Sequence, residues 1–381
     1  MIDYQPLQAG QLALDSERLN DLLQRASVAI AEGPLPSLQL AVARHGKLAL
    51  FETLGSATNN TRYNIYSCTK PLVAAAIWRL MGEGEIELLQ PVANYFPEFG
   101  ASGKGSVTVE QLLCHTAGFP EATLGPKHWS SREERITRMA QWELEWEPGS
   151  QMVYHSLSAH WVLAELIERV AACDYRLYIR REIVAPLGLE GLQLGVPMDQ
   201  QGDIALISSV GSPPTSEELK RMFGTEIAWP DTTDDSMLVF NEPQARAVGV
   251  PGGGAVANAA DVAMFYQALL HNSASVWDNQ VLASALGKVW VNMPDPITGV
   301  PANRGLGVVI AGDDKFKSYR GMGRTVSPRA FGHQGVGNQV SWADPETGIS
   351  FCMLTNGLDA NPLRSARLAS ALSNRAGACA A

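Results

Sequence analysis

The feature that most constrains the fold of this chain is a nearly uninterrupted apolar run from Leu72 to Met81, preceded by Pro71. Proline has no N–H and clashes with the carbonyl four residues back, so a helix tolerates it only in the first turn. A helix over this run must therefore begin near Ser67, and Gly82 together with Gly84 ends it. Because a helix that is apolar on all sides is buried on all sides, the rest of the chain must fold around this one.

The start of this helix places a hydroxyl beside an amine. Ser67 and Lys70 are three residues apart, so both project from the same side of the first turn. Burial at the mouth of an apolar helix favours the neutral lysine, and a serine beside such an amine is an activated nucleophile. The N–H groups and partial positive charge of the helix N-terminus would stabilise an oxyanion. The spacing alone also fits an N-cap serine followed by a solvated lysine.

The composition limits the possible partners and compartments. A chain of 381 residues with 46% hydrophobic content can form a large core, more readily as two subdomains than as one. Its net charge of −10 argues against nucleic acid or an anionic membrane as a partner. No apolar run reaches the length of about eighteen residues that a membrane span needs. Five cysteines without Cys-x-x-Cys spacing, and an N-terminus without a signal-peptide pattern, predict a cytoplasmic protein.

Strand patterns occur at both ends of the chain and helical patterns occupy its middle. We expect strands at residues 37–43, 48–55, 304–310, 337–343 and 349–354. We expect helices at residues 14–33, 131–142, 161–171, 178–185, 262–270 and 362–372. This order predicts one sheet assembled from both chain ends, with the helical middle as an insertion beside it.

Residues 195–250 lack a clear period of either kind, and Pro, Ser, Asp and Gly are scattered through them. A structureless loop of that length is uncommon unless it has a function. We therefore predict that this segment forms a lid or a wall of the substrate site.

A serine nucleophile requires a base, an orienting group and donors for the oxyanion. The Gly-x-Ser-x-Gly elbow is absent, as are His-Glu-x-x-His and paired-cysteine spacings, so no metal or other cofactor is predicted. The remaining candidates are Tyr154 and a turn at residues 332–335, Gly-His-Gln-Gly, that opens a strand. Tyr154 also fits a buried core tyrosine, and His333 also fits a turn histidine bonded to the backbone.

Three segments together resemble the motifs of the serine β-lactamase and penicillin-binding superfamily. They are Ser67-Cys68-Thr69-Lys70, Tyr154-His155-Ser156 and His333-Gln334-Gly335. The pattern is most similar to the class C branch and to the related family VIII carboxylesterases. The resemblance implies an α/β subdomain of residues 1–66 plus 290–381, with an antiparallel sheet flanked by helices. A mainly helical subdomain of residues 67–289 would be inserted, with the active site at the interface.

The resemblance also implies a mechanism. Lys70 would hold Tyr154 near its phenolate form, and Tyr154 would take the proton of Ser67 during attack on the carbonyl. The backbone N–H groups of Ser67 and Val336 would form the oxyanion hole. The residues expected to contact the substrate are Ser156, His333, Gln334 and Gly335.

Two departures from the superfamily pattern affect the expected substrate. Ser156 stands where β-lactamases carry an asparagine, and His333-Gln334-Gly335 replaces Lys-Thr-Gly. The lost ammonium suits a substrate carboxylate, which a mostly neutral imidazole holds less well. We therefore expect a small uncharged ester with a short acyl chain, and a carboxylesterase activity. A β-lactamase or D-amino-acid peptidase with the same serine, and an inactive relative with a binding or scaffold role, stay open, as do acyl-chain length, enantiomer preference and oligomeric state.

Overall fold

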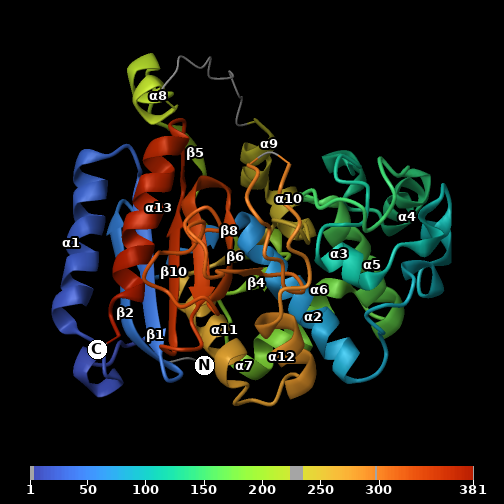
Figure 1. Ribbon diagram of the computed structural model, residues 1–381, viewed down its shortest axis with the longest axis horizontal. Helices are drawn as coiled ribbons and strands as arrows, with labels where there is room; N and C mark the ends of the chain where they lie inside the picture. The colour runs from blue at the N-terminus through green and yellow to red at the C-terminus, as the bar shows by residue number, and fades with distance from the viewer. Residues whose placement is uncertain (1–3, 224–234, 297, 381) are drawn as a thin grey trace.

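The computed structural model describes residues 4–223, 235–296 and 298–380 (Figure 1). Within these ranges six strands form an antiparallel sheet in the order β2-β1-β10-β9-β8-β7. The strands are β1 (Ser37–Arg44), β2 (Lys47–Gly55), β7 (Val309–Ile310), β8 (Phe331–Gly335), β9 (Gln339–Ala343) and β10 (Ile349–Thr355). β1 pairs with β10, with Leu40 opposite Met353. The prediction of one sheet built from both chain ends is confirmed.

Helices cover both faces of this sheet. They are α1 (Ser16–Glu32) and α13 (Pro362–Gly377) on one face and α11 (Ala259–His271) on the other (Figure 1). Strand β1 contributes side chains to the core on both faces of the sheet, because successive side chains of a strand point to opposite faces. Leu40 and Val42 belong to the cluster under α1 and α13, whereas Ala41 and Ala43 belong to the cluster under α11. α11 lies within the predicted helical insertion in sequence and yet packs on the sheet, and the predicted subdomain boundaries stay a prediction.

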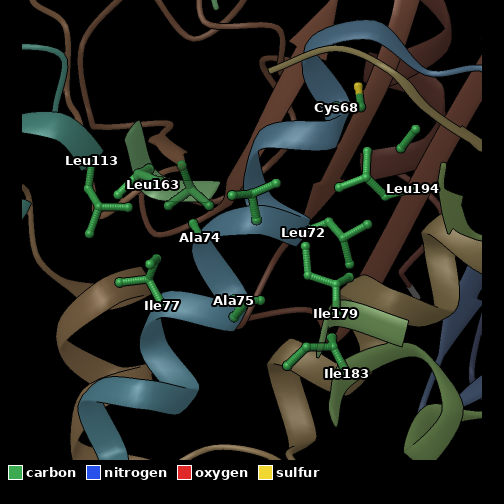
Figure 2. Close-up of a cluster of buried hydrophobic side chains, with 14 of the residues drawn as sticks. Cys68, Leu72, Ala74, Ala75, Ile77, Leu113, Leu163, Ile179, Ile183 and Leu194 are labelled. Atoms are coloured by element: carbon green, nitrogen blue, oxygen red, sulfur yellow. The ribbon is translucent and has the colours of Figure 1, made fainter. Parts of the chain in front are cut away.

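The middle of the chain is mainly helical. Its helices are α2 (Lys70–Gly82), α3 (Val109–Leu113), α4 (Arg132–Gln141), α5 (Ser158–Ala171), α6 (Tyr175–Ile179), α7 (Ala185–Leu187) and α12 (Asn279–Gly287), and a π-helical turn at Arg180–Val184 joins α6 to α7. Pro71 stands in the first turn of α2, and Leu72, Ala74 and Ile77 are at most 1% exposed. Figure 2 shows these side chains among residues of α3, α5 and α6, including Leu113, Leu163 and Ile179. The predicted helix, buried on every side, is confirmed.

Polar residues at helix starts explain where several of these helices begin. Thr108 and Gln111 form a reciprocal capping box at α3. Asp15 accepts hydrogen bonds from the first N–H groups of α1, and Asn258 does the same at α11. Each cap satisfies N–H groups that have no partner inside the helix, so these starts are specified locally.

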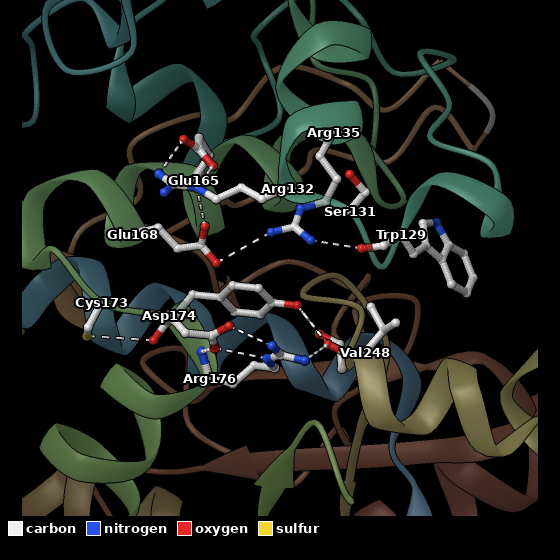
Figure 3. A network of polar contacts seen from close by, with 12 residues as sticks. Trp129, Ser131, Arg132, Arg135, Glu165, Glu168, Cys173, Asp174, Arg176 and Val248 are labelled. Carbon is white, nitrogen blue, oxygen red and sulfur yellow. Dashed lines mark hydrogen bonds and ion pairs between the residues drawn. The ribbon is translucent and has the colours of Figure 1, made fainter. Parts of the chain in front are cut away.

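An ion-pair network holds α4 against α5 (Figure 3). Arg132 lies 2.9 Å from Glu165 and 2.6 Å from Glu168, and Arg135 lies 3.4 Å from Glu168. Arg135 also donates to Trp129 O at 2.8 Å. The carboxylate side chains of Glu165 and Glu168 are only 1% and 4% exposed, so they depend on these arginines for compensation. Because α4 and α5 flank the segment that carries Tyr154, the network fixes both ends of that segment.

Shorter elements complete the part of the chain that the structure describes. The strands are β3 (Tyr63–Asn64), β4 (Gln193–Leu194) and β6 (Ala255–Ala257) in one small sheet, and β5 (Ser208–Val210) with β11 (Gly357–Asp359) in another. The remaining α-helices are α8 (Ser216–Phe223), α9 (Asp235–Leu238) and α10 (Pro243–Val248). None of the helices in the described ranges is long and apolar enough to cross a membrane.

The segment at residues 195–250 is ordered over most of its described length. Phe240 packs edge-on against Tyr66 with ring centres 5.6 Å apart, and the Tyr66 hydroxyl donates to Met237 O at 3.3 Å. This part of the segment therefore packs beside the residue that precedes Ser67, but none of its described residues lines the pocket that Ser67 opens into, and its role as a wall of the substrate site stays a prediction. Residues 224–234 lie outside the described residues, and the role of the segment as a lid stays a prediction.

The predicted strand at residues 304–310 is wrong over most of its length. Only β7, its last two residues, lies in the sheet. Gly305 N–H donates to Val308 O at 3.0 Å, which closes a tight turn. Gly307 has a φ of +83° and approaches α2 so closely that a Cβ atom would clash. The glycines thus serve a chain reversal rather than an extended strand.

The predicted turn at residues 332–335 is also wrong, because these residues lie in β8. Gly332 lies against Trp342 of β9, and a Cβ atom at Gly332 would come within 2.7 Å of Trp342 Cβ. Two glycines therefore allow a close strand pairing here. The reversal comes afterwards, at Val336–Asn338.

Candidate active site

Ser67 lies in a short 3₁₀ turn, Tyr66–Thr69, directly before α2. Tyr66 has a φ of +43°, which is uncommon for a residue with a side chain, and its N–H donates to Asn64 Oδ1 at 3.2 Å. The turn contacts β8 and β9 as well as α2. Ser67 is therefore positioned where the sheet meets the helical part.

Lys70 is completely buried. Its Nζ lies 3.1 Å from Ser67 Oγ and donates to Gly252 O at 2.6 Å. Burial, and in second place the charge of Arg304, hold the pKa of the Lys70 ammonium well below its ordinary value. This direction favours the neutral amine beside the Ser67 hydroxyl, which is the form that the sequence analysis expects for a buried Lys70.

Tyr154 comes from the segment between α4 and α5 and meets the same serine. Its hydroxyl donates to Ser67 Oγ at 2.8 Å, and Lys70 Nζ lies 4.9 Å from the centre of its ring. Burial raises the pKa of Tyr154 to about 12. Its enclosure therefore favours the phenol over the expected phenolate, and the role of Tyr154 as the base stays a prediction.

The end of β8 lies beside the nucleophile. A Cβ atom at Gly335 would stand 3.1 Å from Ser67 N and 2.7 Å from Ile65 O, so only glycine fits between the strand and the turn. Val336 follows directly, with its side chain 45% exposed. The backbone N–H groups of Ser67 and Val336 thus come from adjacent segments, and their role as oxyanion donors stays a prediction.

His333 points one ring nitrogen at a backbone group and leaves the other free. Nδ1 lies 2.7 Å from Gln334 O, so it carries the proton, and the buried Nε2 has no hydrogen-bond partner in the described part of the chain. Burial, followed by the charges of Lys70 and Arg304, lowers the pKa of His333 well below its ordinary value. The imidazole is therefore neutral, and its ring centre lies 6.1 Å from that of Tyr154.

Ser156 is placed differently from the other predicted substrate residues. It is exposed, and it does not line the pocket that Ser67 opens into. Its carbonyl oxygen lies against Gly252, the residue whose own carbonyl accepts the Lys70 hydrogen bond. The prediction that Ser156 contacts the substrate is not supported by this geometry.

Histidine side chains pack near the Tyr154 ring. His115 has a φ of +62°, and its ring centre lies 4.7 Å from that of Tyr154. Its Nδ1 accepts the N–H of His155 at 3.1 Å, and His155 Nε2 accepts the N–H of Phe119 at the same distance. No three His, Cys, Asp or Glu side chains within the described ranges are arranged to hold a metal ion. These histidine rings pack near Tyr154, and their ring nitrogens accept hydrogen bonds from backbone N–H groups.

A pocket of about 440 Å³ opens in front of Ser67. Its walls are formed by Ser67, Met152, Tyr154, Asp295, Thr298, Val300, Pro301, Ala302, Arg304, Val309, Tyr319, Arg320, His333, Gln334, Gly335 and Val336. The sequence motifs predict the presence of Ser67, Tyr154 and the residues at 333–336. They give no indication of Arg304, whose guanidinium carbon lies 5.3 Å from the centre of the Tyr154 ring.

Comparison with known proteins agrees with this arrangement. A family model described as Beta-lactamase matches residues 21–374. The chain belongs to the beta-lactamase family. This family member has the antiparallel sheet and helical insertion that the resemblance implied, and it is a serine hydrolase of the beta-lactamase type.

Individual relatives of this beta-lactamase family member are named as esterases. It is 27% identical over 318 residues to the Esterase/beta-lactamase LipL of Mycobacterium tuberculosis, covering 77% of this chain and 69% of LipL. The crystal structure of a family VIII carboxylesterase matches with a TM-score of 0.76 and 21% identity over 97% of this chain and 99% of the other. EstA from Arthrobacter nitroguajacolicus matches with a TM-score of 0.78 and 22% identity over the whole of both chains. The two structures are evidence for the fold.

Proposed function

We propose that this chain hydrolyses carboxylic esters with a short acyl group through an acyl-enzyme on Ser67. The observation that carries the proposal is that one hydroxyl oxygen, Ser67 Oγ, lies 3.1 Å from Lys70 Nζ and 2.8 Å from the Tyr154 hydroxyl. A nucleophile within hydrogen-bond reach of both an amine and a proton donor is the arrangement that acyl transfer requires.

The pKa directions of Lys70 and Tyr154 support the following proton transfers. The neutral Lys70 amine takes the proton of Ser67 as Oγ attacks the ester carbonyl, and the oxyanion is stabilised by the N–H groups of Ser67 and Val336. The C–O bond to the leaving group then breaks, and Tyr154 donates its hydroxyl proton to the leaving oxygen. The Lys70 ammonium returns a proton to the Tyr154 phenolate. For deacylation, the oxygen of a water molecule attacks the acyl carbon while Lys70 accepts a proton from that water. The bond between the acyl carbon and Ser67 Oγ then breaks, Oγ recovers the proton from Lys70, and the carboxylic acid is released.

Cleavage of an ester requires less proton donation to the leaving group from this site than cleavage of an amide does. An amide nitrogen must be protonated before its bond to carbon breaks, whereas an alkoxide or phenoxide leaves more readily. His333 is neutral and stands in place of the superfamily lysine, so the third motif supplies no charge for a β-lactam carboxylate. LipL and the family VIII carboxylesterase, whose names include esterase activity, also support an ester substrate.

The test compares substrate classes on the wild type and on Ser67→Ala. We expect 4-nitrophenyl acetate to be hydrolysed with burst kinetics, and an acetyl adduct on Ser67 to be detected by mass spectrometry. Turnover of nitrocefin or of a D-alanyl peptide that exceeds turnover of every ester would favour the β-lactamase or peptidase alternative. Absence of any acyl adduct on Ser67, including with a phosphonate inhibitor, would favour an inactive relative.

A further inference from the structure

The guanidinium of Arg304 faces the proposed catalytic residues. Arg304 lines the pocket, and its Cζ lies 5.3 Å from the centre of the Tyr154 ring. Its Nε is buried and has no hydrogen-bond partner among the described residues. The backbone is fixed by Trp290 N–H, which donates to Arg304 O at 2.8 Å, and by Arg304 N–H, which donates to Val291 O at 2.8 Å.

A second arginine that lines the same pocket, Arg320, has hydrogen-bond acceptors for its guanidinium within the protein. Arg320 donates to both carboxylate oxygens of Asp314, at 2.8 and 2.6 Å, and to Pro301 O at 3.0 Å. Its donors are therefore used inside the protein. Within the described ranges Arg304 lacks a comparable set of acceptors, so its charge is available to a molecule in the pocket.

Asp295 is the acidic residue that lines the pocket with Arg304. Its Oδ1 accepts hydrogen bonds from the N–H and the hydroxyl of Thr298, at 2.9 and 3.2 Å, in its own turn. It also attracts Arg304 through space. In a chain of net charge −10, an arginine beside a nucleophile, with a buried Nε that lacks a partner among the described residues, indicates an anionic ligand.

We propose that Arg304 binds a carboxylate on the leaving-group side of the ester substrate. A guanidinium binds a carboxylate through two parallel hydrogen bonds, and the low polarity of the pocket strengthens them. Because Tyr154 is the donor to the leaving oxygen, a group stacked against the Tyr154 ring faces the alcohol part of the ester rather than the acyl chain. The substrate class is therefore esters of hydroxycarboxylic acids with a small acyl group. This inference rests on the proposed function and replaces the uncharged substrate expected from the sequence.

The kinetic test uses two esters that differ only in charge, 3-acetoxybenzoate and 3-acetoxybenzamide. We expect the wild type to prefer the benzoate, and the benzoate-to-benzamide ratio of kcat/KM to fall about ten- to a hundredfold in Arg304→Gln. Arg304→Lys keeps the charge but loses the bidentate geometry, so its benzoate-to-benzamide ratio should lie between those of the wild type and Arg304→Gln. The matched control is Arg324→Gln, which removes the same charge from an exposed arginine outside the pocket and should leave the ratio unchanged. An unchanged ratio in a folded Arg304→Gln protein would overturn the inference.

A binding test separates failure of this inference from failure of the esterase proposal. Ser67→Ala is titrated with the product analogues 3-hydroxybenzoate and 3-hydroxybenzamide by calorimetry. We expect tighter binding of the benzoate, and loss of that preference in Ser67→Ala/Arg304→Gln. If the neutral ester is hydrolysed and neither test shows a role of Arg304, the inference fails and the esterase proposal stands. If no ester is hydrolysed, the esterase proposal fails and the titration alone decides the inference. A preference for charge on the acyl side, measured with the 4-nitrophenyl monoester of adipic acid against that of adipamic acid, would overturn the assignment to the leaving-group side.

Discussion

The base that takes the Ser67 proton is revealed by the pH dependence of kcat/KM for a neutral ester. Lys70 acts as a base only while its amine is deprotonated, and burial places its pKa well below the ordinary lysine value. Activity is therefore lost as the pH falls through the folded pKa of Lys70 and is fully present above it. We expect kcat/KM for 4-nitrophenyl acetate to be level above the folded pKa of Lys70 and to fall about tenfold per pH unit on its acidic side.

A Tyr154 phenolate as the base gives a different profile. With the pKa of Tyr154 at about 12, the phenolate fraction increases tenfold with each pH unit below that value. kcat/KM would then rise by about a hundredfold between about pH 8 and 10. Bringing that pKa down to near 7 would require about 7 kcal/mol of additional stabilisation of the phenolate, starting from about 12. A completely buried lysine that disfavours its own positive charge does not supply energy of that order.

The assay is stopped-flow measurement of the nitrophenol burst, with Ser67→Ala recorded at every pH to subtract spontaneous hydrolysis. The circular dichroism spectrum at each pH controls for unfolding. An unbroken tenfold rise per unit across the alkaline range would refute the assignment of Lys70 and restore Tyr154 as the base.

Three substitutions test the remaining structural claims. Tyr154→Phe removes the hydroxyl that donates to Ser67 Oγ, and we expect kcat to fall about 10²- to 10⁴-fold with little change in Tm; near-normal turnover would exclude Tyr154 from the relay. Gly335→Ala puts a methyl group 3.1 Å from Ser67 N and displaces the Val336 N–H, so kcat/KM should fall about a hundredfold, and an unaltered rate would contradict the proposed oxyanion hole. Arg135→Met leaves the buried carboxylate of Glu168 with poorer compensation, and urea titration should give a free energy of unfolding lower by about 3 kcal/mol. Arg138→Met, on the exposed side of the same helix, should change it by no more than about 0.5 kcal/mol, and equal effects of both variants would argue against the network.

The main sheet and the central helix could be predicted because their signals are local. The hairpin of β1 and β2 is marked by two apolar runs around a short turn at His45 and Gly46, and α2 by Pro71 and its apolar run. β8 carries no such signal, since Gly332 and Gly335 enclose polar residues without alternation. It becomes a strand because β9 pairs with it and because glycine permits the close approach to Trp342.

Some residues of the candidate site could likewise be predicted from the sequence, and others could not. The motifs identify Ser67, Lys70 and Tyr154 as neighbours, and the structure brings Lys70 Nζ and the Tyr154 hydroxyl each within hydrogen-bond distance of Ser67 Oγ. Arg304 could not be predicted, because its place in the pocket depends on the turn that begins at Gly305 and on a bridge to Val309. The protonation states of Lys70 and Tyr154 could not be predicted either, because burial shifts their pKa values and tertiary packing determines the burial.

The pairing of β1 with β10 has a consequence for how the enzyme is made. The Thr355 hydroxyl donates to Ser37 O across 318 residues of chain, so the ribosome completes the first hairpin long before its partner strand exists. One edge of β1 stays open to other chains during most of synthesis, which is where a chaperone would act and where aggregation would begin. A nascent chain that ends before β8 already carries the nucleophile but lacks the strand that leads to Val336. We therefore expect the chain to become able to catalyse the proposed reaction only late in translation, and truncation of about the last fifth of the chain to abolish that reaction as completely as loss of the serine does.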